Sequence, residues 1–145
     1  MNILYKNIIG NAPLELYSLK TSFINGYNFF CTLDRISLCN VHLTDAAVIN
    51  LYIFRTLYED ILEADAIDGQ TTKTAIGTEK FYMIKNLCIP VGATLILEKE
   101  DINIDYVNYQ IFIELNAADS KVDVILYESA DKLPLETFTN TDGYY

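Results

Sequence analysis

The sequence is poor in basic residues and has no long apolar run. Its 145 residues include 10 Lys and Arg against 20 Asp and Glu, which gives a formal net charge of −10. An acidic chain repels a phosphate backbone, so the composition disfavours direct binding to nucleic acid. Apolar stretches such as AAVI at 46–49 are far shorter than the roughly 20 residues that span a bilayer, which argues against a membrane-spanning segment. The start, MNILYKNIIGNAPLELY, lacks the features of a secretory signal, and we expect none.

Cysteine is scarce as well. The three cysteines, Cys31, Cys39 and Cys88, are an odd number and show no CxxC spacing. This pattern is typical of a protein made in a reducing compartment and argues against a disulfide framework. We therefore predict buried, reduced thiols.

Motifs for the common enzyme chemistries are missing. There is no GxSxG, GxxxxGK, GxGxxG or HExxH, and His42 is the only histidine. A Cys-His dyad is disfavoured because Cys39 and His42 are three residues apart in or near a strand and point to opposite faces. We therefore predict a non-enzymatic protein with no catalytic residue, no cofactor and no metal ligand.

Two acidic groups are the remaining candidates for chemistry. Five carboxylates lie together at Glu59, Asp60, Glu63, Asp65 and Asp68. Their spacing lacks the alternating ligands of a calcium loop, so a solvated charged loop is favoured and a divalent-cation site is the alternative. The second group, around Lys99, is interpreted as a solvated face and consists of Glu98, Glu100, Asp101 and Asp105.

What the sequence does have is a large excess of aromatic and β-branched residues. Eleven Tyr and seven Phe stand beside many Ile, Val and Thr, with no Trp, and these types favour strands. Short segments of period two recur between turn-forming residues, without helical periods. They predict an all-β fold: an antiparallel β-sandwich, jelly-roll-like, in a single domain.

Individual strands follow from the same pattern. Residues 33–41 alternate with one slip in phase, which suggests a bulge. Residues 46–58 are apolar on both faces, so this strand is expected to lie centrally or against a neighbouring chain. Residues 59–79 are predicted to be a loop, with one helical turn near 60–64. Two later strands are expected to point these side chains inward: Ile111, Ile113 and Leu115, then Val122, Val124 and Leu126.

The segment Pro90-Val91-Gly92-Ala93 is predicted to reverse the chain between two strands of a hairpin, with Gly92 at positive φ. The ends of the chain differ from its body. Residues 1–12 are expected to form an N-terminal arm or edge strand, residues 13–131 the sandwich, and residues 132–145 an interface-forming tail.

Aromatic side chains offer a further possibility. Packing in the core and at interfaces is favoured, and a sugar-stacking platform is the alternative. The residues concerned are Tyr27, Phe29, Phe30, Tyr52, Tyr82, Tyr106 and Tyr109.

Residues 36–54 and 80–126 resemble a known group of proteins. The features that carry the likeness are Cys39-Asn40, the apolar strand 50–54, the Tyr-containing strand 82–86, the turn IPVGATL at 89–95, Ala117-Ala118 and the closing strand 122–125. In this order they resemble small β-sandwich virion proteins of tailed bacteriophages, in particular marine and cyanobacterial phages. The likeness covers about three fifths of the chain and consists of turn and core positions.

This resemblance implies a non-enzymatic virion structural protein: a capsid decoration, head-fibre or neck/tail accessory protein. Such a protein is made in the host bacterial cytoplasm, needs no cofactor and has other virion proteins as partners. The resemblance also favours a trimer among the possible homo-oligomers. The alternative is a carbohydrate-binding receptor module that uses surface tyrosines. The candidate interface residues are Tyr52, Phe54, Leu135, Phe138, Tyr144 and Tyr145.

Overall fold

The computed structural model describes residues 2–18, 21–24, 27–62, 71–105 and 108–132. Within these ranges every regular element is a strand. The strands are β1 (Asn2–Ile9), β2 (Leu14–Tyr17), β3 (Thr21–Ile24), β4 (Tyr27–Asn40), β5 (Ala47–Leu62), β6 (Thr71–Ile89), β7 (Thr94–Glu98), β8 (Gln110–Leu115) and β9 (Lys121–Lys132).

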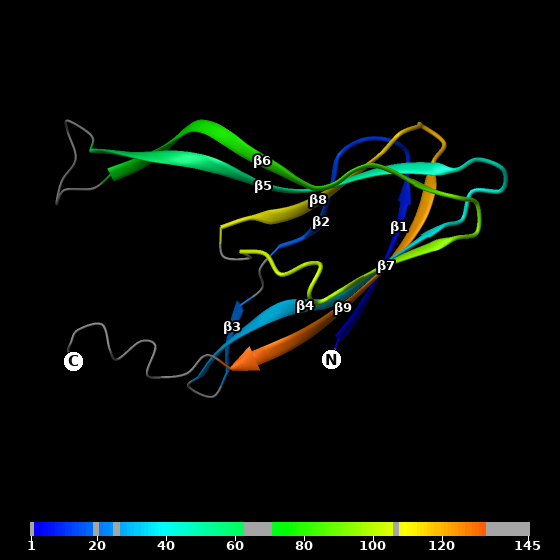
Figure 1. The fold of residues 1–145 in the computed structure, drawn as a ribbon. Helices are drawn as coiled ribbons and strands as arrows, with labels where there is room; N and C mark the ends of the chain where they lie inside the picture. The colour runs from blue at the N-terminus through cyan, green and yellow to red at the C-terminus, as the bar shows by residue number, and fades with distance from the viewer. Residues whose placement is uncertain (1, 19–20, 25–26, 63–70, 106–107, 133–145) are drawn as a thin grey trace.

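The strands form two antiparallel sheets that face each other (Figure 1). The first sheet has the order β1-β9-β4-β3, and β7 also pairs with β4; the second has the order β2-β8-β5-β6. Every recorded strand pair is antiparallel. This arrangement confirms the predicted all-β, antiparallel sandwich.

Alternating side chains of both sheets fill the core. In β8, Ile111 and Ile113 are fully buried, and Phe112 between them is only partly buried. In β9, Val122, Val124 and Leu126 are buried in the same way. Period-two alternation therefore predicted the inward faces of both strands correctly, because one face of each strand packs on the opposite sheet.

Two further strand predictions are confirmed. The pairing of β4 with β9 shifts register between Leu33 and Arg35, at the expected slip in phase. This shift keeps Leu33, Ile36 and Leu38 all in the core. Strand β5 lies between β8 and β6, which agrees with its apolar character on both faces.

The turn at residues 90–93 is confirmed, but the hairpin is wrong. The Ala93 amide donates to the Pro90 carbonyl at 3.0 Å, and Gly92 has φ +76°. However, β6 pairs with β5 and β7 pairs with β4, so the turn carries the chain from one sheet to the other. The cause is Asn40 at the end of β4, whose carbonyl accepts from the Gly92 amide and whose amide donates to the Ala93 carbonyl.

The loop and helical turn predicted for residues 59–79 are also wrong. Strand β5 continues to Leu62 and β6 begins at Thr71, so most of this segment forms a two-stranded hairpin that reaches beyond the sandwich (Figure 1). Both faces of such a ribbon meet water, so polar and charged residues do not interrupt its pairing. Residues 63–70, at the tip, lie outside the described residues.

The ends of the chain are placed in part. Residues 2–9 form β1, which pairs along β9 from Asn2 opposite Glu128 to Ile9 opposite Lys121. Strand β9 ends at Lys132, and residues 133–145 lie outside the described part. The described residues contain no helix long and apolar enough to cross a membrane.

Candidate functional site

Four aromatic rings lie together on the outer side of the second sheet. Tyr52 on β5 is directly opposite Phe112 on β8 and Tyr82 on β6. These side chains point outward because their chain neighbours, such as Leu51 and Ile111, point into the core. We call Tyr52, Phe54, Tyr82 and Phe112 the aromatic face.

The rings of the aromatic face are in direct contact. Tyr52 and Phe112 stack with centroids 5.7 Å apart and planes inclined by 10°. Tyr82 packs edge-on against Tyr52 at 5.7 Å, and Phe54 packs edge-on against Phe112 at 5.4 Å. Edge-on and offset contacts of this kind add about 0.5–1.5 kcal/mol per pair beyond simple burial. The face is therefore a preorganised cluster rather than four independent rings.

Two lysines lie over this cluster. Lys80 Nζ is 4.1 Å from the centroid of Tyr52 and 4.9 Å from that of Tyr82, and Lys85 Nζ is 5.0 Å from Tyr82. Lys80 also lies 3.9 Å from a carboxylate oxygen of Glu114. A hydrogen bond with Tyr82 raises the pKa of Lys80, and burial raises the pKa of Tyr52. The Lys80 ammonium group thus stays charged beside the ring faces.

The rings differ in accessibility. Tyr52 is only 4% exposed, whereas Tyr82 is 44% exposed, and Phe54 and Phe112 are half-buried. Tyr52 therefore forms the buried part of the aromatic face and packs against the rings of Tyr82 and Phe112. Tyr82 is the ring that offers most surface to a partner. Phe112 was not among the predicted site residues, although its place between the inward-pointing Ile111 and Ile113 indicates an outward side chain.

Of the other predicted aromatic residues, Tyr109 belongs to a different cluster. Tyr109 packs edge-on against Phe81 at 6.1 Å, and Arg55 lies over its ring at 4.9 Å. Phe81 is opposite Ile53, which packs on the core, so this second cluster is on the other side of the sheet from Tyr52. Tyr106, Leu135, Phe138, Tyr144 and Tyr145, and the side chains of Tyr27 and Phe29, lie outside what the structure describes.

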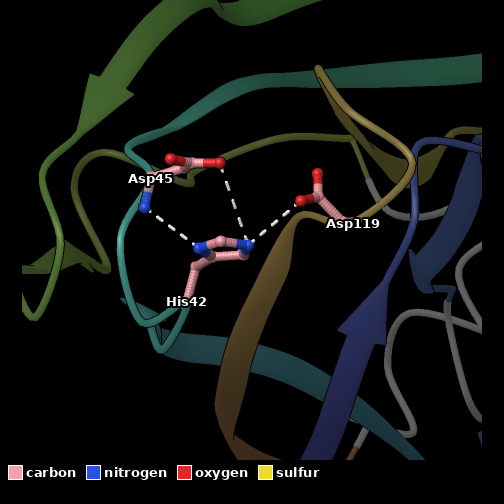
Figure 2. Close-up of side chains that lie close together, drawn as sticks. All are labelled: His42, Asp45 and Asp119. Atoms are coloured by element: carbon pink, nitrogen blue, oxygen red, sulfur yellow. Dashed lines mark hydrogen bonds and ion pairs between the residues drawn. The ribbon is translucent and has the colours of Figure 1, made fainter.

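A separate polar cluster lies at one end of the sandwich (Figure 2). His42 Nε2 is 3.2 Å from Asp119 Oδ2 and 4.0 Å from Asp45 Oδ2. His42 Nδ1 accepts hydrogen bonds from the backbone amides of Thr44 at 3.2 Å and Asp45 at 3.0 Å. His42 and Asp119 are 77 residues apart, so no local pattern brought them together in the sequence analysis.

The three side chains place one ligand atom each within 4.8 Å of one another, close enough together to contact one metal ion. The tautomer of His42 argues against one. An imidazole that binds a metal through Nε2 carries its proton on Nδ1, but here Nδ1 faces two backbone N–H donors. Nε2 therefore holds the proton and donates toward Asp119. The cluster fits a hydrogen-bonded clip better than a metal centre.

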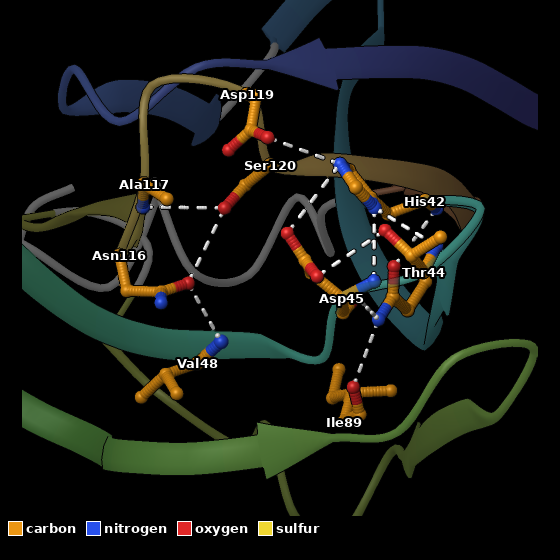
Figure 3. A network of polar contacts seen from close by, with 10 residues as sticks. His42, Thr44, Asp45, Val48, Ile89, Asn116, Ala117, Asp119 and Ser120 are labelled. Atoms are coloured by element: carbon orange, nitrogen blue, oxygen red, sulfur yellow. Dashed lines mark hydrogen bonds and ion pairs between the residues drawn. The ribbon is translucent and has the colours of Figure 1, made fainter.

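The clip is part of a wider network (Figure 3). Asn116 Oδ1 accepts from the Val48 amide at 2.9 Å and from Ser120 Oγ at 3.2 Å, and Ser120 Oγ accepts from the Ala117 amide at 3.2 Å. These bonds tie the start of β5 to the turn between β8 and β9. The network holds two loops that connect the sheets in a fixed position.

The structure does not pair the single histidine with a cysteine among the described residues, and the three cysteines differ in exposure. His42 makes its ring hydrogen bonds with the Asp119 carboxylate and two backbone amides, and Cys39 is not among these partners. Cys31 and Cys39 are half-buried, and the expectation of a buried thiol is wrong for Cys88, which is exposed on β6 opposite Val48.

Of the acidic group around Lys99, Glu98, Glu100, Asp101 and Asp105 are all exposed, as predicted. Glu98 also forms an ion pair with Arg35 at 3.2 Å, and Lys99 lies 3.7 Å from Asp34. The group at residues 59–68 is mostly outside the described residues; Glu59 is exposed on β5.

Comparison of the chain with protein-family models, curated proteins and solved structures finds no match.

Proposed function

We propose that this protein is a non-enzymatic structural protein of a tailed-phage virion, which docks onto the capsid or the neck and tail. The observation that carries the proposal is the aromatic face, in which Tyr82 is exposed over a stacked base of Tyr52 and Phe112. Large preorganised aromatic side chains are enriched at protein interfaces because they bury much area at a low cost in side-chain entropy. The resemblance of residues 36–54 and 80–126 supports the same class.

The hairpin of β5 and β6 supports this proposal. It exposes three large apolar side chains: Tyr58 at 59% and Ile76 at 60% lie beyond the sandwich, and Phe81 at 51% lies where β5 still pairs with β8. Apolar surface buried on docking contributes about 25 cal/mol per Å², from which the cost of association is subtracted. We propose that the hairpin and the aromatic face together form the docking surface, with the chain assembled as a trimer.

The experiment is cosedimentation of the full chain with phage particles, using a matched pair of variants. Tyr82→Ala removes the accessible ring of the aromatic face, and we expect it to weaken particle binding by at least about tenfold. Tyr5→Ala removes a ring that is 73% exposed on β1, outside the proposed surface, and should bind as the unmodified chain does. Equal binding by both variants contradicts docking through the aromatic face.

A second candidate is a carbohydrate-binding module, favoured by the same exposed Tyr82 ring. Sugars stack on flat aromatic faces, and Lys85 and Glu114 near the cluster offer polar groups. A glycan array separates the two functions. Binding to a defined glycan that Tyr82→Ala abolishes, without cosedimentation with particles, would favour the carbohydrate-binding module.

A further inference from the structure

Strand β6 forms a long edge of the second sheet. It has 19 residues, and within the described part of the chain it pairs only with β5. The far side of an edge strand presents a row of backbone N–H and C=O groups that can pair with another strand. Natural proteins normally protect long edges against such pairing, so a poorly protected stretch of β6 would indicate a surface that binds another strand.

The other edges are shorter than β6. Strand β1, at one edge of the first sheet, has eight residues, and β2, β3 and β7 have only four or five each. The carbonyls of Glu15 and Leu16 on β2 accept hydrogen bonds from Lys6 Nζ, at 3.4 and 3.0 Å, so a lysine from β1 occupies that edge. Short strands and edge lysines are recognised devices against unwanted pairing.

Strand β6 also carries lysines, but two of its three do not protect the edge. Lys80 and Lys85 lie over the rings of the aromatic face. Lys73 remains, and Ile76, three residues further along the strand, is 60% exposed. The distal half of the edge thus combines unpaired backbone with exposed apolar surface.

The charge of β6 indicates what kind of strand it would accept. It contains three lysines and one glutamate, Glu79, in a chain whose net charge is −10. Glu79 is already paired with Arg55. An acidic strand is therefore the complementary partner.

The chain itself contains such a segment in residues 133–145, LPLETFTNTDGYY. It has two acids, Glu136 and Asp142, and no base, and it is rich in Thr, Phe and Tyr. It follows β9, which ends on the side of the molecule toward which the β5–β6 hairpin reaches (Figure 1). At about 3.3 Å per residue this segment spans about 40 Å when extended, enough to reach a neighbouring molecule.

We propose that β6 of one copy accepts residues 133–145 of a second copy as an added strand. Backbone hydrogen bonds along the edge supply affinity, and Lys73 and Ile76 select an acidic, partly apolar strand. Donation from one copy to the next is a head-to-tail contact, which forms a ring such as a trimer when the rotation between successive copies closes. This inference rests on the assembly through subunit contacts proposed above, and it names the two surfaces that meet.

The test uses full-length variants and light scattering. The acceptor variant, Lys73→Glu with Ile76→Asp, alters two exposed side chains of β6. The donor variant, Thr137→Pro with Thr139→Pro, prevents residues 133–145 from pairing as a strand. A control variant, Lys121→Glu with Ile9→Asp, makes the same types of change at an exposed cross-strand pair of β1 and β9. Circular dichroism and the melting temperature verify the fold of each variant.

We expect the unmodified chain and the control to form the same oligomer and both other variants to be monomers, with self-association weakened at least about tenfold. In a mixture, the unmodified residues 133–145 of the acceptor variant can pair with the unmodified β6 of the donor variant. The mixture should therefore form a 1:1 heterodimer. If the acceptor variant does not fold, an oligomer formed by the donor variant still overturns the proposal.

A monomeric unmodified chain, or a mixture of folded variants that stays monomeric, also overturns it. Failure of the virion role is distinguishable, because the chain would then self-associate through β6 without sedimenting with particles.

Discussion

Asn40 and Ile89 belong to different sheets and are joined by a buried hydrogen bond. The Asn40 side-chain amide donates to the Ile89 carbonyl at 2.9 Å and to the Asp45 carbonyl at 2.9 Å, and its oxygen accepts from the His42 amide at 3.0 Å. Asn40 is fully buried. This single side chain therefore closes one end of the sandwich.

Asn40→Ala is expected to destabilise the fold by about 2–4 kcal/mol, because it leaves two carbonyls and one amide without their partner. The measurement is urea denaturation followed by circular dichroism. Asn7→Ala is the control, since Asn7 makes an exposed bond to Asp123 at 2.7 Å and its loss should cost about 0.5 kcal/mol or less. A similar cost for both substitutions would contradict the role of Asn40.

Gly92→Val should destabilise the turn between the sheets by about 1–2 kcal/mol, because Gly92 has φ +76° and a β-branched side chain disfavours that conformation. A Cβ at this position meets nothing within 4 Å, so the cost arises from the backbone alone. Gly77→Ala is the matched control: it also has open space, has no positive φ, and should be neutral or slightly stabilising. Equal melting temperatures for Gly92→Val and the unmodified chain would show that the turn tolerates a side chain.

The aromatic face should lose stability at alkaline pH. The pKa values of Tyr52 and Lys80 are raised in the folded chain, by burial and by a hydrogen bond with Tyr82 respectively. Groups that bind protons more tightly when folded stabilise below their unfolded pKa values, near pH 10, and lose this contribution as the pH rises further. The melting temperature should therefore fall above pH 10, and less steeply in Tyr52→Phe. Tyr5→Phe, at an exposed position, should keep the full decrease; if Tyr52→Phe does so too, the assignment to Tyr52 is wrong.

Metal ions should not affect the fold. Because His42 Nδ1 accepts from two backbone amides, the cluster with Asp45 and Asp119 is held as a hydrogen-bonded clip. Neither EDTA nor added Zn²⁺ should move the melting temperature by more than about 1 °C in differential scanning calorimetry. A stabilisation by Zn²⁺ that His42→Gln removes would instead assign a metal site to this cluster.

Local pattern predicted the strands better than their partners. The alternation at Ile111, Ile113 and Leu115 fixed the buried face of β8, since burial on one face leaves a direct trace in the sequence. The turn chemistry of Pro90 and Gly92 predicted a reversal, but not that it joins two sheets. That outcome depends on Asn40, about fifty residues earlier. Which sheet a strand joins is decided by such distant contacts.

Composition was misleading for the β5–β6 hairpin. The acidic and Thr-rich segment was predicted to be a loop because a strand was expected to bury one face. The ribbon projects beyond the sandwich and buries little on either face. At the candidate site, Tyr52 and Phe54 were predicted, whereas the contact between His42 and Asp119 needed the fold to bring two turns together.

The proposed role as a structural component of a virion is tested most directly by quantitative mass spectrometry of density-purified particles from the infection that produces the protein. We expect the chain to be present in a fixed ratio to the major capsid protein in every preparation. Its absence from purified particles, while it is abundant in the lysate of the same cells, would contradict the virion role.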